Sequence, residues 1–284
     1  MKIGISTSCL YPMYTEKAFY EIASRGVELT EIFFNANCEL QQPFIDELKN
    51  IKESFGIQIS SVHPTMSLAE SFMLFSNYDR RFQEGIETYK RYGEIAARLG
   101  AKYIIMHGGK PNNAIDNRGY FERFHKVAEC VKQNGATLLQ ENVVLFRAGN
   151  IDTLRDMSDY LGDDVNFRLD VKQSIRGGYS PYDVLKILGK KIKHLHLSDN
   201  NAQNDCMLPL TGNFDFKKFL STAQKCGYTG DAVVELYRNA FGVVLLYEQK
   251  NALRLHPLSR GGACRDGVSA APLRHPHRCD NPRA

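Results

Sequence analysis

The chain has 284 residues, of which 43% are hydrophobic and 24% are charged. This composition is typical of a globular protein and excludes a fully disordered chain, a collagen-like repeat and a small disulfide-rich domain. The net charge of +4 comes from residues 251–284, which hold six Arg and two Asp, so the first 250 residues are neutral. A neutral body argues against a nucleic-acid surface.

The sequence also indicates the cellular compartment of the protein. No apolar run approaches the roughly 18–20 residues of a membrane span, and the first residues lack the basic region and long apolar run of a signal peptide. The seven cysteines are odd in number, and no pair has C-x-x-C spacing. We therefore expect free thiols in a cytoplasmic protein without a membrane segment.

Along the chain, short β-type runs alternate with helical patterns. The eight predicted strands are 2–6, 27–34, 57–63, 103–107, 137–142, 165–170, 192–198 and 231–237. Helical patterns follow the first seven strands, at 15–26, 42–56, a long stretch ending with 90–100, 120–135, 150–162, 180–189 and 214–227. Almost wholly apolar strands suit a parallel sheet covered on both faces. Eight such units in about 240 residues predict an α/β fold, the (β/α)8 TIM barrel. A doubly wound sheet is the alternative, but the glycine-rich phosphate loop that it would require is missing from the sequence.

The composition changes abruptly where the eighth helix should lie. Residues 251–284 contain no Lys, Glu, Ile, Phe or Tyr and have no helical period. We therefore predict that the eighth helix is missing or replaced by an atypical C-terminal tail. The predicted organisation is a barrel domain over 1–242 and a disordered basic tail over 243–284, as a shifted reading frame would produce. A natural basic extension is the alternative.

Six consecutive strands carry a metal-capable side chain at or near the carboxyl end. These residues are His63, His107, Glu141, Asp170, His196 and Glu235. The carboxyl ends of barrel strands meet at one face, so the six side chains should converge there. Three His and three carboxylates without a thiolate suit a divalent metal that remains open to water or substrate. Each residue alone also fits a structural role, but clustered buried carboxylates without a cation would be strongly destabilising.

Seven motifs at the strand ends and in the loops point to one superfamily. They are SSVHP (61–65), MHGG (106–109), LQENV (139–143), RLDVKQ (168–173), HLHLSDN (194–200), LPLTGNFDF (208–216) and VVELYR (233–238). With these motifs, residues 1–242 resemble the xylose isomerase-like TIM-barrel superfamily. That superfamily includes sugar-phosphate isomerases and epimerases as well as endonuclease IV-type AP endonucleases.

The resemblance implies a metal centre and its chemistry. In the ketose 3-epimerases of this superfamily, two Glu, one Asp and one His hold one divalent ion, and the two Glu transfer the proton. The matching residues here are Glu141, Asp170, His196 and Glu235, and Glu141 and Glu235 would be the catalytic pair. The metal would be Mn, Mg or Co, with Zn as an alternative. The predicted activity is a divalent-metal-dependent isomerase or epimerase of a sugar or sugar phosphate, with proton transfer through an enediolate.

The substrate contacts depart from the epimerase pattern. Gln173 stands where those enzymes have a His, and Ala202 stands where they have an Arg. We expect Gln173, together with Lys110 and Arg147 on loops at the same face, to bind the substrate; the two loop residues could instead be ordinary solvated charges. The only expected partner is the small-molecule sugar or sugar phosphate, although homodimers are common among such barrels.

The alternative activity is an endonuclease IV-like metal-dependent phosphodiesterase, an AP endonuclease. The resemblance implies that His63 and His107 would then hold a second metal together with Glu141. A third zinc in those enzymes needs a His at the position of Gln173 and a D-x-H after the seventh strand, and both are missing here. The neutral body of the chain also argues against this alternative.

Overall fold

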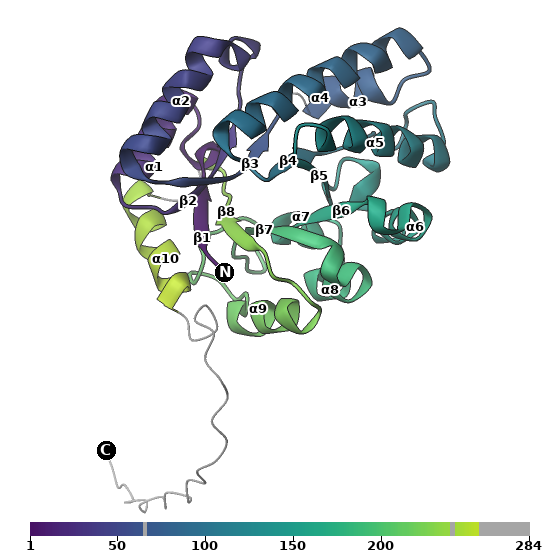
Figure 1. The fold of residues 1–284 in the computed structure, drawn as a ribbon. Coiled ribbons are helices and arrows are strands. Elements are labelled where there is room, and N and C mark those ends of the chain that lie inside the picture. Colours follow the sequence, from purple (N-terminus) through teal and green to yellow (C-terminus); the bar gives the residue numbers. More distant parts are fainter. Residues whose placement is uncertain (65–66, 239–241, 256–284) are drawn as a thin grey trace, which may run out of the picture.

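A closed barrel of eight parallel strands forms the centre of the protein, with helices around it (Figure 1). The computed structural model describes residues 1–64, 67–238 and 242–255. The strands are β1 (Ile3–Ser6), β2 (Leu29–Phe33), β3 (Gln58–His63), β4 (Tyr103–Met106), β5 (Thr137–Glu141), β6 (Asn166–Asp170), β7 (Ile192–Leu197) and β8 (Asp231–Val234). The helices are α1 (Thr15–Ser24), α2 (Gln42–Phe55), α3 (Ser67–Leu74), α4 (Asp79–Leu99), α5 (Asn117–Lys132), α6 (Ile151–Leu161), α7 (Val171–Arg176), α8 (Pro181–Leu188), α9 (Phe216–Lys225) and α10 (Val243–Leu255). The predicted TIM barrel is confirmed.

The strands pair in chain order, and the ring closes between the first and the last. Ile3 of β1 is paired with Ala232 of β8, and Ile5 is paired with Val234. All eight predicted strands are present; seven lie within two residues of their expected ends, and β8 ends three residues before the predicted 237. The predicted helical stretch before residue 100 is divided into α3 and α4, and α7 is an additional short helix directly after β6.

Helix α4 shows how the sequence builds the outer layer. Its buried residues include Phe82, Tyr89, Tyr92 and Leu99, which recur at helical spacing and face the barrel. The helix ends where Gly100 adopts a left-handed conformation with φ of 68°. Glycine meets this requirement at little steric cost, so the chain can turn sharply into β4.

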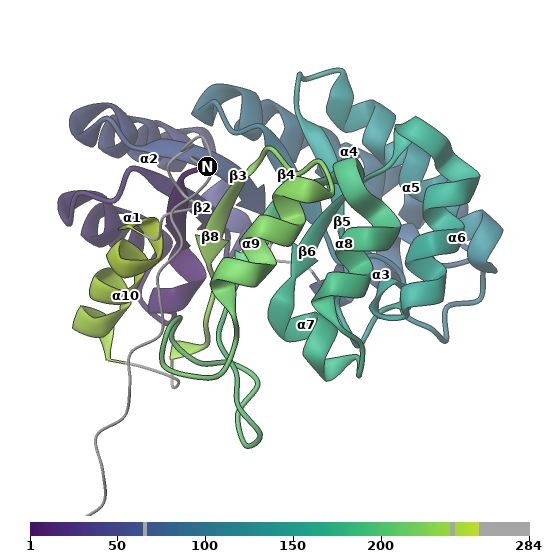
Figure 2. The same ribbon diagram turned by 90° about the horizontal axis from the view of Figure 1, so that it is seen from below.

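The carboxyl-terminal part of the barrel differs from the prediction. Val243–Leu255 form helix α10, which packs against β1 and lies beside α1 in both views (Figures 1 and 2). Leu246, Lys250 and Leu253 are buried at i, i+4 and i+7, which is the spacing of one helix face. A helix therefore covers β1 where the sequence predicted no eighth helix, and it lies wholly within the predicted tail of 243–284. The rest of the predicted tail, 256–284, lies outside the described residues.

The barrel interior is polar below its carboxyl-terminal mouth. Glu31, Ser61, Arg168 and His194 are all buried there, and Ser61 donates a hydrogen bond of 2.7 Å to Glu31. Barrel interiors are usually filled by branched apolar side chains. A charged layer at this depth is therefore unusual, and the predicted metal-binding residues lie above it.

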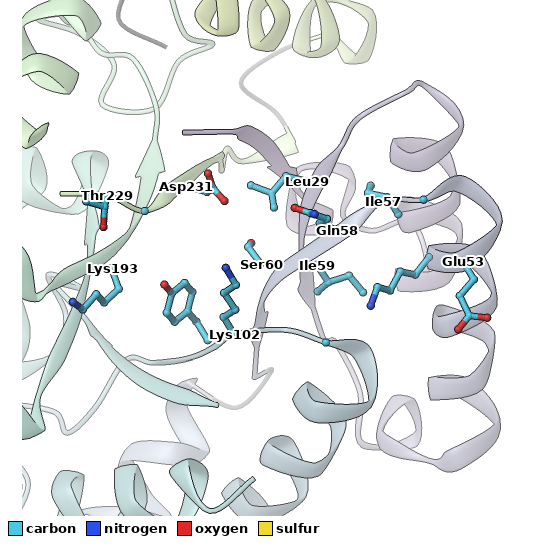
Figure 3. A pocket seen from close by; sticks show the side chains of 15 residues that line it. Leu29, Glu53, Ile57, Gln58, Ile59, Ser60, Lys102, Lys193, Thr229 and Asp231 are labelled. Carbon is cyan, nitrogen blue, oxygen red and sulfur yellow. The ribbon is translucent and has the colours of Figure 1, made fainter. Parts of the chain in front are cut away.

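A cavity of about 670 Å³ opens at the other end of the barrel, where the strands begin (Figure 3). Gln58, Lys102, Lys193 and Asp231 are among its lining residues. Active sites of TIM barrels lie at the carboxyl-terminal face, so this cavity is not the candidate site. Among the described residues, no helix is both long and apolar enough to cross a membrane.

Candidate metal centre and substrate pocket

Four metal-capable side chains converge at the carboxyl ends of four adjacent strands. Glu141 ends β5, Asp170 ends β6, His196 lies in β7 and Glu235 follows β8. One ligand atom from each residue lies within 4.8 Å of the others. Parallel neighbours in a closed sheet bring these strand ends together, because every strand in the barrel runs in the same direction. The four residues are those that the sequence predicted to hold a metal.

Three buried atoms of this group have no hydrogen-bond partner in the described part of the chain. They are Glu141 Oε2, Asp170 Oδ2 and His196 Nδ1. The other oxygen of Asp170, Oδ1, accepts a hydrogen bond of 2.9 Å from the Gln173 backbone N–H and caps α7. Buried polar atoms in proteins are almost always paired. Each of the three atoms has a charged neighbour within 4 Å but no hydrogen bond, and such atoms in one tight cluster fit a divalent cation.

A second group shares Glu141. His63 Nε2 and His107 Nε2 are 3.0 Å apart, and they lie 3.7 Å and 3.0 Å from Glu141 Oε2. His63 Nδ1 is 3.0 Å from the Pro64 carbonyl oxygen, so a proton on Nδ1 would leave Nε2 free as a ligand. Gly108, with φ of 92°, lets the chain turn directly after His107. The structure therefore brings together the residues of the predicted second metal.

Glu31 of β2 orients His196, a role that the sequence analysis did not identify. Glu31 Oε2 lies 3.1 Å from His196 Nε2, while His196 Nδ1 lies 3.1 Å from Glu235 Oε2. Arg168 Nη1 also lies 2.9 Å from His196 Nε2, so Nε2 lies between a donor and an acceptor. A proton on Nε2 would be donated to Glu31 and would leave the Nδ1 lone pair for a metal. Burial and Arg168 lower the pKa of His196, but Glu31 and Glu235 together raise it to about 9, so a cation at Nδ1 would replace the proton that this nitrogen holds in the metal-free site.

Arg168 supplies a buried positive charge beneath the centre. Its guanidinium contacts Glu141 Oε1 and lies 3.5 Å from Glu31 Oε2. Burial alone would raise the pKa of Glu141, but Arg168 and the neighbouring His107 lower it well below its ordinary value. Glu141 is therefore held in its anionic form, as a metal ligand or a proton acceptor must be.

Lys172 is a second buried cation in the site. Its Nζ lies 3.1 Å from Glu235 Oε2 and 3.6 Å from Asp170 Oδ2, and the side chain is only 2% exposed. Burial lowers the pKa of Lys172, but Asp170 and Glu235 raise it well above its ordinary value. For Glu235, burial raises the pKa, whereas Lys172 and His196 lower it well below the ordinary range.

A pocket of about 560 Å³ opens above the metal-capable groups. Its polar lining residues include the predicted His63, His107, Glu141, Glu235, Gln173 and Lys110, together with Arg168, Lys172 and Arg176. The side-chain Oε1 of Gln173 accepts a hydrogen bond of 3.2 Å from the Val144 backbone N–H. This contact positions the loop after β5 at the mouth of the pocket.

Arg147 is not among the residues that line this pocket. Its guanidinium donates hydrogen bonds to the carbonyl oxygens of Lys110, Asn113 and Ile115 and to the side chain of Asn117. The Arg147 guanidinium therefore stabilises the loop between β4 and α5. The predicted substrate contact at Arg147 therefore receives no support from the geometry, whereas Lys110 and Gln173 do reach the pocket.

Sequence rules could have found two of the three missed residues. Glu31 lies near the carboxyl end of β2, just as the six predicted residues lie at the ends of later strands. Arg168 precedes Asp170 by two positions, so it shares a strand face one layer deeper. Lys172 lies on α7, where strand alternation no longer applies, and its position became clear only from the fold.

The comparisons with known proteins agree with this architecture. A family model described as xylose isomerase-like TIM barrel matches residues 19–254. The chain belongs to this family. Fructoselysine 3-epimerase of Escherichia coli O157:H7 is 23% identical over 273 residues, which are 91% of this chain and 98% of that protein.

Solved structures resemble this xylose isomerase-like barrel over most of its length. A D-tagatose 3-epimerase-like protein has a TM-score of 0.75 and 19% sequence identity, and the match covers 89% of this chain and 96% of that one. The IOLI protein, described with a binding zinc atom, has a TM-score of 0.73 and 17% identity, and the match covers 91% and 98% of the two chains. At this identity the likeness establishes the fold, and the family predicted from the motifs is confirmed.

Proposed function

We propose that the protein is a metal-dependent isomerase or epimerase of a sugar or sugar phosphate. The observation that carries the proposal is the position of Glu141 and Glu235. Both carboxylates belong to the four-residue metal-capable group, and both also line the pocket above it. The similarity to epimerases that act on sugars supports the same class of substrate.

The metal would be held by Glu141, Asp170, His196 and Glu235, whose ligand atoms lie within 4.8 Å of one another; in the first three residues a buried atom has no hydrogen bond. Such an ion supplies a Lewis acid, which polarises a substrate carbonyl and makes the neighbouring C–H more acidic. Mn, Mg and Co suit a carboxylate-rich site, and Zn also accepts this set of ligands.

The residues of the chain divide the proton transfer between them. One of Glu141 and Glu235 removes the proton from carbon, and the other, or the same one, returns it to the enediolate. Arg168 keeps Glu141 ionised, and Lys172 does the same for Glu235. Lys172 also places a positive charge at the pocket wall, where it can stabilise an oxygen that gains negative charge.

The test incubates ketohexoses with the protein and Mn²⁺ in deuterated water. NMR then measures how fast a substrate C–H exchanges with solvent deuterium. Glu141→Gln and Glu235→Gln should each slow exchange at least a hundredfold, because general acid–base catalysis contributes about 10²–10⁴. Glu122→Gln, on the exposed side of α5, is the matched control and should exchange like the wild type. Wild-type exchange in both site variants would refute the assignment.

The pair of imidazoles favours a second candidate, a two-metal phosphodiesterase. His63, His107 and Glu141 form a separate metal-capable group beside the first, and paired metals are typical of such hydrolases. Cleavage of a duplex with an abasic site, with zinc supplied and with a chelator as control, tests this activity. Cleavage that disappears in His63→Ala but not in Glu122→Gln would favour the hydrolase.

A further inference from the structure

Three large apolar side chains stand exposed at the mouth of the substrate pocket. They are Tyr11, Leu145 and Tyr237, which are 59%, 69% and 50% exposed and which all line the pocket. We call these three residues the rim shelf. They come from the loops after β1, β5 and β8, so the fold brings them together from distant parts of the sequence. Exposed apolar groups that gather at a pocket are typical of binding surfaces.

Tyr237 is held in place although half of its surface is exposed. Its hydroxyl accepts a hydrogen bond of 2.8 Å from Arg176 Nη1, and Lys172 Nζ lies 4.7 Å from the ring centroid. Arg176 is itself held by an ion pair of 2.5 Å with Asp205. A ring fixed in this way offers a flat face that loses little conformational entropy when it binds a ligand.

Leu145 is presented by a tight turn. The Phe146 backbone N–H donates a hydrogen bond of 2.9 Å to the Val143 carbonyl oxygen, and the side chains of Val143 and Phe146 are buried. Both neighbours anchor the turn, so Leu145 projects from its tip. The Val144 backbone N–H is bound by Gln173, which fixes the turn against α7.

The rim shelf and the polar floor belong to one cavity of about 560 Å³. Cavities of this size hold drug-sized ligands, which are larger than a free monosaccharide. A sugar on the metal-capable floor would therefore leave the rim shelf available for more of the same molecule. A protein partner would need a much wider apolar patch than three side chains.

We infer that the substrate is a sugar conjugate, in which the rim shelf binds an apolar or aromatic substituent attached to the sugar. The inference deepens the proposed function, because it places the sugar half of the molecule at the proposed catalytic carboxylates. It names a chemical class, a ketose that keeps its carbonyl free and carries an alkyl, aryl or amine-linked group on another carbon, rather than an unsubstituted sugar.

The experiment compares two probes that keep the C2 carbonyl, 1-O-methyl-fructose and 1-O-benzyl-fructose, by titration calorimetry on the 284-residue chain with Mn²⁺. The benzyl probe should bind about tenfold more tightly, since burial of an aromatic ring is favourable. Leu145→Ser should reduce this ratio to about twofold or less. Tyr20→Ser, which removes a ring that is 53% exposed on α1, is the control and should leave the ratio unchanged.

Equal dissociation constants for the two probes in the wild type would overturn the inference, as would no binding of the benzyl probe. A ratio that Leu145→Ser leaves intact would also overturn it. Deuterium exchange separates the two proposals. If deuterium exchanges but the benzyl probe is not preferred, the proposed function is supported and the rim-shelf inference is refuted. If the benzyl probe is preferred but no deuterium exchanges, the rim shelf binds a substituent and the proposed function is refuted.

Discussion

At the scale of single residues, the centre depends on charges placed in a layer that TIM barrels usually fill with apolar side chains. Glu31, Arg168 and His196 are each at most 1% exposed. Burial would raise the pKa of Glu31, but His196 and Arg168 lower it well below the ordinary range. The buried charges are thus compensated by one another, which is the condition under which proteins tolerate them.

Glu31→Gln should weaken metal binding without removing a ligand. Carboxylates that orient a metal-binding His typically contribute 10–100-fold to metal affinity, and we expect a loss in this range for Mn²⁺, measured by titration calorimetry. Glu39→Gln is the matched control, because Glu39 is also buried but binds the Asn35 backbone N–H. Equal Mn²⁺ affinity in Glu31→Gln and the wild type would show that Glu31 does not orient His196.

At the scale of elements, hydrophobic periodicity in the sequence was sufficient to predict every strand and the helices that follow the first seven. It failed at α10 for a specific reason. Only Val243–Lys250 precede the change of composition, and the helical face continues into the altered segment at Leu253. A helix can continue into a segment of different composition as long as its buried positions remain apolar or have an apolar stem.

Leu253→Ala tests whether α10 contributes to the stability of the barrel. The side chain is fully buried, so its truncation should lower the free energy of unfolding by about 2–5 kcal/mol. Glu248→Ala, at an exposed position of the same helix, should change it by less than about 0.5 kcal/mol. Both values follow from urea denaturation, and similar small effects for the two variants would mean that α10 does not pack on the barrel.

The sequence predicted the part of the candidate site that lies at the ends of the strands. The four metal-capable residues and the two imidazoles follow from one rule, because side chains at the carboxyl ends of parallel strands converge. Lys172 and the rim shelf do not follow from it. Their positions depend on how α7 and three separate loops fold over the mouth, and no periodic pattern encodes those conformations.

At the scale of the whole molecule, one buried carboxyl links global stability to pH. Glu70 of α3 accepts hydrogen bonds from the Tyr89 hydroxyl and the Gly108 backbone N–H. Burial raises the pKa of Glu70 to about 7 from its ordinary value of 4.5. Between these two values the folded state binds more protons than the unfolded state, so the free energy of unfolding falls as the pH rises.

Glu70→Gln should remove this dependence, since an amide stays neutral when buried. From pH 5 to pH 8 the wild type should lose about 2–3 kcal/mol more than the variant, because each pKa unit corresponds to about 1.4 kcal/mol. Urea denaturation at the two pH values measures the difference. Glu53→Gln, at an exposed position of α2, should behave like the wild type, and identical pH dependence in all three proteins would exclude Glu70 as the cause.

The pairing of β1 with β8 also governs how the molecule can be made. Of the barrel elements, β1 is synthesised first, whereas its partner strand with Ala232 and the covering helix α10 are synthesised last. Until then the growing sheet has two open edges, which are the surfaces at which nascent chains aggregate. The ring can therefore close only after β8 has been synthesised, and we expect the unfinished barrel to depend on chaperones more than the closed barrel does.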